Sequence, residues 1–416
     1  MSIIIDIMYI IREKYLIKAL ERGKTHEIVL LSGLRGSGKT SLLGDIARSL
    51  RRDKPPVRVV EVCGGEGIKT DIELLDAAHA LGAGFSALIV DNAEYIDNLL
   101  SALREIHKKY KTTVYLSGQK TVVLEHLIEQ CTSLSCEILK IHPFSYREFL
   151  EHQSLKESRV SYMHYLSCGG LPQSLMLPCT SNHSFTVRKI CADSFLLGNI
   201  IERFSVRNPP VIRLLLEKIA KTQGDQISTR SISESFASKR ITVSNQTVIE
   251  YLEYCRQSGL LEQVPVIDVK TGKVIEAGAS WYFTDNGLRS AFSSGANNTD
   301  SSLKKTDTEK AFENALYTRL IDEGYAVVKG RVSKGKDFLE YISFVCTKDN
   351  KKIYLQISPF SAGASSQIRK RQALLAVRDA WPKYLIGEED DSVQDDSIIR
   401  LSARKLLYDG VEKSLR

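Results

Sequence analysis

The sequence predicts an α/β fold built on a parallel sheet, followed by a helical segment and a second, smaller α/β unit. Two observations lead to this prediction. Five short apolar segments alternate with helical patterns before residue 142, which is typical of a parallel sheet covered on both faces. The motif GLRGSGKT, at residues 33–40, lies between the first apolar segment and the helix that follows it.

The first part of the chain is expected to contain short strands and longer helices. Strands are expected at residues 27–31, 57–62, 87–90, 112–116 and 138–141. Helices are expected between them at residues 40–50, 71–81, 94–110 and 121–129, and an amphipathic helix at residues 7–20 precedes the first strand.

After residue 145 helices replace the apolar strands, and the sequence GGLP at residues 169–172 interrupts them. Residues 211–292 show three helical patterns and then two β-like runs, at 260–269 and 273–283, which is the order of a winged helix. The last part has helical patterns at 308–323 and 367–379 and strand patterns at 325–332, 338–345 and 352–357. The expected segments are an N-terminal helix (1–22), a core (23–144), a helical lid (145–208), a winged-helix domain (209–292), a polar linker (293–302) and a small α/β domain (303–416).

The composition excludes several classes of protein. Hydrophobic residues make up 43% of the 416 residues and charged residues 26%, as in globular proteins and unlike collagen-like or disordered chains. The net charge of +7 permits contact with nucleic acid but does not argue for it. No apolar run approaches the roughly 18 residues of a membrane-spanning helix, and no secretory signal begins the chain. A cytoplasmic protein without a membrane partner is therefore expected.

The eight cysteines form no C-x-x-C pair, so neither a zinc ribbon nor a disulfide framework is expected. This pattern is typical of a reducing compartment. His152, His164 and Cys168 lie near one another in the sequence, but a structural zinc site would need a second pair of ligands.

The motif at residues 33–40 predicts a phosphate-binding loop. Its glycines allow backbone N–H groups to converge on phosphate oxygens, and the next helix points its positive end at the same anion. Lys39 is expected to reach the β- and γ-phosphates, and Thr40 to bind Mg²⁺. The residues expected to hold the nucleotide are Gly33, Arg35, Gly36, Ser37, Gly38, Lys39, Thr40 and Ser41. Because no N-K-x-D segment for guanine follows, ATP and ADP are favoured over GTP.

Residues at the ends of later strands are expected to complete the site. Asp91 follows an apolar strand and is expected to hold Mg²⁺ together with Thr40. Many such ATPases have a glutamate directly after this aspartate to take the proton of the attacking water, but this chain has Asn92 there. Either Glu94 replaces that glutamate, or the protein hydrolyses ATP slowly and mainly senses nucleotide. Ser117, after the fourth strand, is a candidate contact for the γ-phosphate or the water, or a simple turn residue.

Other segments are distinctive as well. They are HPFSYREF at 142–149, GGLP at 169–172, IIERFSVRN at 200–208, YFTDNGLR at 282–289 and PKY at 382–384. Together with the motif at 33–40 and Asp91, they resemble a prokaryotic family of AAA-type ATPases over nearly the whole chain. The resemblance implies a P-loop NTPase core of the AAA type, a helical lid, a winged helix and a C-terminal domain similar to restriction-type nucleases.

The C-terminal domain departs from that resemblance at two positions. A nuclease of this type needs two carboxylates that hold Mg²⁺ and a lysine near the scissile phosphate. This chain has Ser343 where the family has an aspartate and Gln356 where a nuclease needs a glutamate, and no lysine follows two residues later. Glu313, Asp337 and Glu340 lie nearby, but at the wrong spacing. The domain is therefore expected to be a nuclease-like fold without nuclease activity.

Two functions fit these features. The first is an ATPase that acts as a nucleotide-driven switch coupled to the winged helix. The alternative is a nucleotide-sensing scaffold without hydrolysis that binds DNA, a protein partner or a second copy of the chain; an active nuclease is a third reading. The expected recognition helix, at 244–258, has Lys239 and Arg240 before it but carries two glutamates that oppose phosphate binding. Candidate arginine fingers are Arg147, Arg203 and Arg207.

Overall fold

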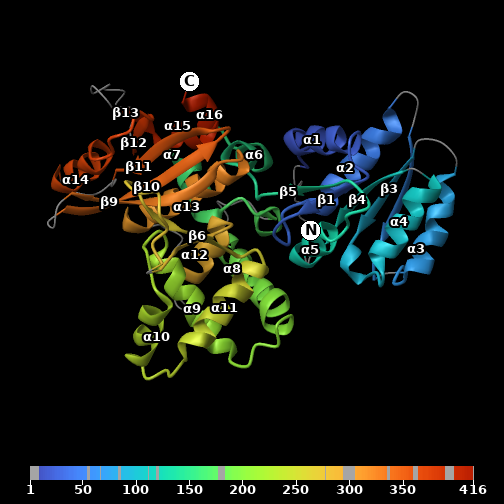
Figure 1. Ribbon diagram of the computed structural model, residues 1–416, viewed down its shortest axis with the longest axis horizontal. Coiled ribbons are helices and arrows are strands. Elements are labelled where there is room, and N and C mark those ends of the chain that lie inside the picture. Colours follow the sequence, from blue (N-terminus) through green and yellow to red (C-terminus); the bar gives the residue numbers. More distant parts are fainter. Residues whose placement is uncertain are drawn as a thin grey trace. The chain divides into compact units, whose positions relative to one another are not determined.

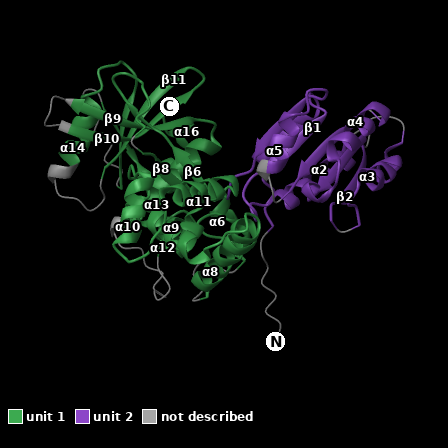
Figure 2. Cartoon of the chain, turned by 60° about the horizontal axis from the view of Figure 1, so that its bottom comes forward, with its two compact units in different colours: residues 1–8, 144–416 green, residues 9–143 purple. Residues whose placement is uncertain are grey.

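A computed structural model of the chain describes most of its residues. The described ranges are 9–53, 57–65, 67–82, 86–110, 112–118, 121–176, 183–276, 278–293, 305–334, 338–358, 364–388 and 398–415. Within them the chain forms two compact units (Figure 2). Residues 9–143, purple and labelled unit 2 in Figure 2, are called the first unit because they come first in the sequence, and residues 144–416, green and labelled unit 1, are called the second unit. Asp337, most of the expected linker and most of an acidic stretch after residue 388 lie outside the described residues.

The first unit is a five-stranded parallel sheet with helices on both faces (Figure 1). Its strands are β1 (Ile28–Ser32), β2 (Arg58–Cys63), β3 (Ser86–Asp91), β4 (Thr113–Ser117) and β5 (Cys136–Lys140). Its helices are α1 (Glu13–Gly23), α2 (Lys39–Arg52), α3 (Asp71–Ala78), α4 (Leu99–Tyr110) and α5 (Thr121–Glu129), with short 3₁₀ helices η1 (His79–Leu81) and η2 (Ala93–Tyr95).

The spatial order of the sheet, β2-β3-β4-β1-β5, determines which loops meet. Because β4 lies between β1 and β3, the carboxyl ends of these three strands are neighbours, and ligands of parallel α/β sheets bind at such ends. All residues of β1 and β4 are buried, as expected for strands covered on both faces. Ile28 and Leu30 pack with α3, α4 and α5, whereas Val29 and Leu31 pack with α1 and α2.

The predicted parallel α/β core is therefore confirmed, with differences at helix ends. The helix expected at 7–20 is found at 13–23, and it packs on the core through Tyr15 and Ala19. The helix expected at 94–110 begins only at Leu99, because the short helix η2 ends at an extended Ile96 and Asn98 adopts a left-handed backbone (φ 51°) directly before Leu99.

The second unit contains helices and two further sheets. Its helices are α6 (Tyr146–His152), α7 (Arg159–Cys168), η3 (Pro172–Leu175), α8 (Ser184–Phe195), the π-helix η4 (Leu196–Glu202), α9 (Pro209–Thr222), α10 (Thr229–Ala237), α11 (Asn245–Gln257), α12 (Asn286–Ser293), α13 (Lys305–Asp322), α14 (Ala364–Leu375), α15 (Ala403–Asp409) and α16 (Val411–Ser414). Its strands are β6 (Leu261–Val264), β7 (Val266–Asp268), β8 (Ser280–Phe283), β9 (Ala326–Lys334), β10 (Phe338–Lys348), β11 (Lys351–Ile357), β12 (Lys383–Gly387) and β13 (Ile399–Ser402).

The two β-like runs expected after α11 pair with each other along their length. β6 pairs antiparallel with β8, and in β7 Ile267 pairs antiparallel with Val274, with backbone hydrogen bonds from Asp268 to Lys273 at 2.9 Å and from Ile275 to Val266 at 2.8 Å. β7 also joins the larger sheet, whose order is β13-β12-β11-β10-β9-β7. Val266 lies opposite Lys329, and Asp268 forms an ion pair with Arg331 at 3.7 Å. β7 thus belongs both to this hairpin and to the edge of the C-terminal sheet.

Three further observations concern the described residues as a whole. None of their helices is both long and apolar enough to cross a membrane. No three or more of their His, Cys, Asp and Glu side chains gather as a metal site would require. Their seven cysteines are free thiols.

Candidate functional site

The loop between β1 and α2 has a backbone that only glycine adopts easily. Gly33, Gly36 and Gly38 have φ values of 147°, 81° and 93°. A Cβ atom at Gly33 would lie 2.3 Å from the carbonyl oxygen of Ile141, so no other residue fits there without movement. Ser37 is fully buried between two of these glycines. The spacing of the motif is therefore required by the shape of this loop.

Lys39 is the first residue of α2 and is buried, with 6% of its surface exposed. Its Nζ atom donates hydrogen bonds to the carbonyl oxygens of Gly33 and Leu34, at 2.9 and 3.0 Å. Burial lowers the pKa of Lys39 to about 8, although the nearby carboxylates of Asp91 and Glu94 favour its charged form. A triphosphate would offer this ammonium stronger acceptors than the carbonyls that it contacts now.

Thr40 and Ser117 meet at the carboxylate of Asp91. The hydroxyl of Thr40 donates to Oδ2 of Asp91 at 2.7 Å, and the hydroxyl of Ser117 donates to Oδ1. The three residues come from the start of α2 and the ends of β4 and β3, which the strand order brings together. Hydroxyl and carboxylate oxygens are hard ligands that suit Mg²⁺, so the residues present fit that ion.

Glu94 belongs to the same cluster. It lies on η2, three residues after Asp91, and a Cβ atom at Gly118 would be only 2.0 Å from its Oε2 atom. The carboxylate thus lies directly over the end of β4, next to Ser117, within the electrostatic reach of Lys39. Gly118 is a site residue that sequence reasoning missed, since one glycine after a strand usually signals only a turn.

The side chain of Asn92 points away from this cluster. Its side-chain amide donates to Sγ of Cys63, at the end of β2, at 3.3 Å, and its backbone N–H donates to Oδ1 of Asp91 at 2.9 Å. The left-handed turn at this residue therefore directs the side chain towards β2, on the side of β3 opposite to β4.

The remaining expected residues have varied surroundings. Arg35 is half-buried in the loop, and Ser41 is exposed, with its carbonyl oxygen accepting a hydrogen bond from Tyr9 at 3.4 Å. In the second unit, Arg147 lies 3.9 Å from the carboxylate of Asp409. Arg203 donates to the carbonyl of Gln257 at 3.4 Å, and Arg207 is exposed.

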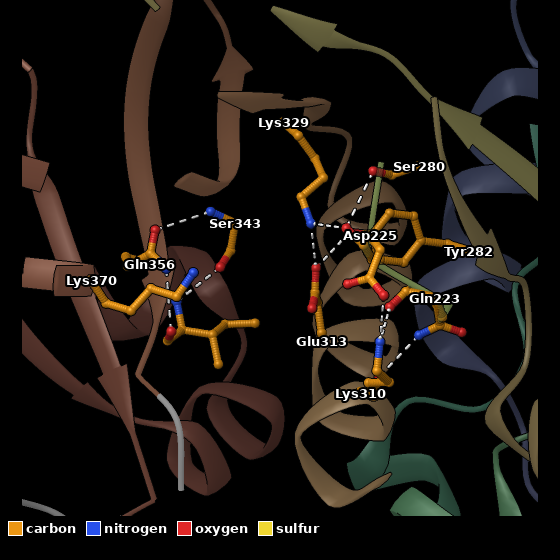
Figure 3. Close-up of polar contacts among 12 residues, drawn as sticks. Gln223, Asp225, Ser280, Tyr282, Lys310, Glu313, Lys329, Ser343, Gln356 and Lys370 are labelled. Atoms are coloured by element: carbon orange, nitrogen blue, oxygen red, sulfur yellow. Dashed lines mark hydrogen bonds and ion pairs between the residues drawn. The ribbon is translucent and has the colours of Figure 1, made fainter. Parts of the chain in front are cut away.

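Ser343 and Gln356, the two positions where the sequence departs from the expected nuclease pattern, face each other on neighbouring strands (Figure 3). The backbone N–H of Ser343 donates to Oε1 of Gln356 at 3.2 Å, and the hydroxyl of Ser343 accepts from the N–H of Ile357 at 3.1 Å. Gln356 is fully buried. Both side chains therefore accept hydrogen bonds from backbone N–H groups.

Glu313 and Glu340, which remain near those positions, are held by cations. Glu340 forms ion pairs with Lys370 at 3.1 Å and Arg369 at 3.4 Å. Glu313, on α13, accepts from Lys329 at 2.9 Å and from the hydroxyl of Tyr282 at 2.6 Å (Figure 3). Burial raises the pKa of Glu313, but these two partners outweigh burial and hold the pKa below its usual value.

Lys329 also donates to the carbonyl of Gly224, and Lys310 donates to the carbonyl of Gln223 at 3.0 Å. Both acceptors lie in the turn after α9. This buried cluster therefore ties the turn between α9 and α10 to the C-terminal helix α13 and strand β9 (Figure 3).

Two of the distinctive sequence segments, GGLP and YFTDNGLR, pack against each other inside the second unit and are joined by hydrogen bonds. The carboxylate of Asp285 is buried and accepts hydrogen bonds from the backbone N–H groups of Gly170, at 2.8 Å, and Leu288, at 3.0 Å. Gly169 has a φ of 71°, and a Cβ atom there would lie 2.3 Å from the nitrogen of Gly287. These segments have a packing role that the sequence did not reveal.

Comparisons with known proteins agree with this geometry. Residues 25–150 match a family model described as an AAA domain, and residues 159–300 match a domain of unknown function (DUF8612). An uncharacterized protein of Haemophilus influenzae is 22% identical over 402 residues, covering 93% of this chain and 96% of the relative. The uncharacterized protein MJ1544 of Methanocaldococcus jannaschii is 22% identical over 255 residues, covering 57% of this chain and 56% of the relative.

One solved structure is similar enough to support the fold. The Walker-type ATPase PABY2304 of Pyrococcus abyssi has a TM-score of 0.50 and 13% identity, covering 68% of this chain and 96% of its own. The expected resemblance is thereby confirmed. Residues 25–150 match the AAA model, the residues after them match a domain of unknown function, and the chain is similar in fold to that ATPase.

Proposed function

We propose that the protein binds ATP with Mg²⁺ at the loop of residues 33–40 and hydrolyses it slowly, with Glu94 as the general base. The observation that carries this proposal is the position of the Glu94 carboxylate, against Gly118 and within the electrostatic reach of Lys39. A carboxylate can take a proton from water, and Asn92, whose amide contacts Cys63, has no such capacity.

In this proposal each group has a defined task. The loop N–H groups and Lys39 hold the phosphates, and Thr40 and Asp91 hold Mg²⁺, which neutralises phosphate charge. Ser117 orients the attacking water, and Glu94 accepts its proton. Hydrolysis is slow because the base reaches the site from η2, a short 3₁₀ helix, and not from the position directly after Asp91.

We further propose that nucleotide binding switches the state of the second unit. The three helices α9, α10 and α11 and the hairpin after them have the order of a winged helix, and β7 of this hairpin also pairs with β9. On α11, Arg256 makes two hydrogen bonds to Glu253, at 2.8 and 2.7 Å, so the positive charge of Arg256 is neutralised by this carboxylate. Ile249 on the same helix is 43% exposed. A protein partner, or a second copy of the chain, fits this helix better than DNA does.

Phosphate release from purified protein, with and without DNA, tests the proposal. Turnover above background that disappears in Asp91→Ala is the expected result. Tight ATP binding without turnover would favour the alternative, a nucleotide-sensing scaffold. Stimulation by DNA would overturn the preference for a protein partner. Nicking of plasmid DNA with Mg²⁺ or Mn²⁺ would overturn the inactive assignment of the nuclease-like domain.

A further inference from the structure

Arg12 contacts two segments that matter to the proposed site. It lies just before α1 and is buried, with 6% of its surface exposed. Its Nη1 atom donates to the carbonyl oxygen of Ser37 at 3.3 Å and to that of His142 at 2.8 Å, and Nη2 donates to the carbonyl oxygen of Pro143 at 3.4 Å. One guanidinium therefore holds the phosphate-binding loop and the last two residues of the first unit at the same time.

On the loop side, Arg12 donates a hydrogen bond to a backbone carbonyl of the phosphate-binding loop. Ser37 lies between Gly36 and Gly38, whose left-handed backbones turn the chain sharply. The N–H groups of such a loop must point at the anion, so its carbonyl groups need partners inside the protein. Arg12 supplies the partner for the carbonyl of Ser37. It is thus a positioning residue for the loop, at a distance from the phosphates.

On the other side, the segment that leaves β5 supports the loop at a second point. The N–H of Ile141 donates to the carbonyl of Ser32 at 2.7 Å, and the carbonyl of Ile141 lies where a Cβ atom at Gly33 would be. The start of the loop therefore packs directly against the residue before His142. Close packing therefore couples the loop to Ile141, whereas Arg12 is the side chain that connects the loop to His142 and Pro143.

The loop must change its hydrogen bonds when a triphosphate binds, because Lys39 now donates to the carbonyls of Gly33 and Leu34. Building on the proposed function, we propose that Arg12 transmits nucleotide occupancy of the loop to residues 142–143, through which the chain continues into the second unit. The guanidinium suits this role because its donors are fixed in one plane. If the carbonyl of Ser37 moves, the guanidinium must move with it, and its hydrogen bonds to the carbonyls of His142 and Pro143 then change as well.

Hydrogen exchange of the full-length protein, measured with and without Mg²⁺–ATP, tests this inference. In the wild type, nucleotide is expected to slow exchange at residues 33–40 and to change exchange at 141–149. In Arg12→Met, which keeps most of the buried volume, ATP affinity should fall because the loop loses a support, but protection at 33–40 should persist when ATP is raised until it saturates the variant. The change at 142–149 should be lost, whereas a change at Ile141 should survive because this residue packs directly against Gly33. Arg12→Ala is the second variant, in case one of the two does not fold.

Arg22→Ala is the matched control. Arg22 also connects α1 to β5, through an ion pair with Glu137 at 3.3 Å, but the described contacts of its side chain do not include the loop. This variant should respond as the wild type does. A nucleotide-dependent change at 142–149 that survives in either Arg12 variant would overturn the inference, as would a wild type that protects 33–40 without any change at 142–149. A wild type without protection at 33–40 would instead overturn the proposed ATP binding.

Discussion

The hydroxyl of Thr40 donates a 2.7 Å hydrogen bond to the Oδ2 atom of Asp91. These residues are 51 positions apart in the sequence, yet the insertion of β4 between β1 and β3 brings their elements to one edge of the sheet. Ser117 contacts the other oxygen of the same carboxylate. Thr40 and Asp91 would hold a divalent cation through their side-chain oxygens, and the hydroxyl of Thr40 would keep its proton.

Thr40→Ala should therefore remove the contribution of Mg²⁺ to ATP affinity while ATP binding in EDTA changes little. The reason is that the hydroxyl is a cation ligand and does not hold the phosphates directly. Calorimetric titration with ATP in Mg²⁺ and in EDTA measures both quantities. Thr25→Ala, which removes an exposed hydroxyl bonded to Arg22, is the control. An affinity gain from Mg²⁺ as large in Thr40→Ala as in wild type would contradict this assignment.

Glu94→Gln should lower the rate of ATP hydrolysis by about 10²- to 10⁴-fold and leave ATP affinity nearly unchanged, because it removes the proton acceptor and keeps the shape. Single-turnover phosphate release and a separate binding titration measure the two effects. Asn92→Ala is the comparison, since its amide contacts Cys63, and it should change the rate much less. The opposite ranking of the two variants would show that Asn92 acts on the water and Glu94 does not.

The affinity for ATP should fall as pH rises through about 8. Burial lowers the pKa of Lys39 to about 8, so the ammonium that binds phosphate is lost above this pH, at up to about tenfold in affinity per pH unit. The unfolded lysine keeps its proton up to its usual pKa of 10.5, so the unfolded state binds more protons than the folded state between these values. The contribution of Lys39 to folding stability therefore rises with pH in this window.

Titrations with ATP between pH 7 and pH 9, together with denaturation curves over the same range, measure both trends. In Lys39→Met both trends should be absent. An ATP affinity that is constant between pH 7 and pH 9 in the wild type would exclude Lys39 as the phosphate ligand that loses its proton.

Glu313→Ala should destabilise the second unit by about 3–5 kcal/mol, because it leaves Lys329 buried without its carboxylate. Chemical denaturation measures this change. Arg230→Ala, in the exposed pair of Arg230 with Glu234, should have little effect. Equal stability of both variants would mean that the cluster around Glu313 does not join the turn after α9 to α13 and β9.

The core could be predicted from the sequence because its signals are local. Each apolar strand flanked by helices can be recognised within its own short segment. The same is true of the glycine spacing that a tight loop requires. Thr40, Asp91 and Ser117 could be placed together because parallel strands end at one edge of a sheet. Their hydrogen bonds then follow from the strand order.

Other features depend on contacts between distant segments, which periodicity does not record. The left-handed turn at Asn92, which directs its side chain to Cys63, has no signal in the sequence around Asp91. The pairing of β7 within its hairpin is local, but its second pairing, with β9, is not. No motif marks Arg12, and only the fold shows which carbonyl groups it reaches.

The most direct measurement is calorimetric titration of wild type and Lys39→Ala with ATP in the presence of Mg²⁺. We expect one ATP bound per wild-type chain and at least a hundredfold weaker binding to the variant, because charge-assisted hydrogen bonds to phosphate are lost (a difference of about 2.7 kcal/mol or more). Equal affinity of the two proteins for ATP, in a variant that is folded, would contradict the binding of ATP phosphates by Lys39.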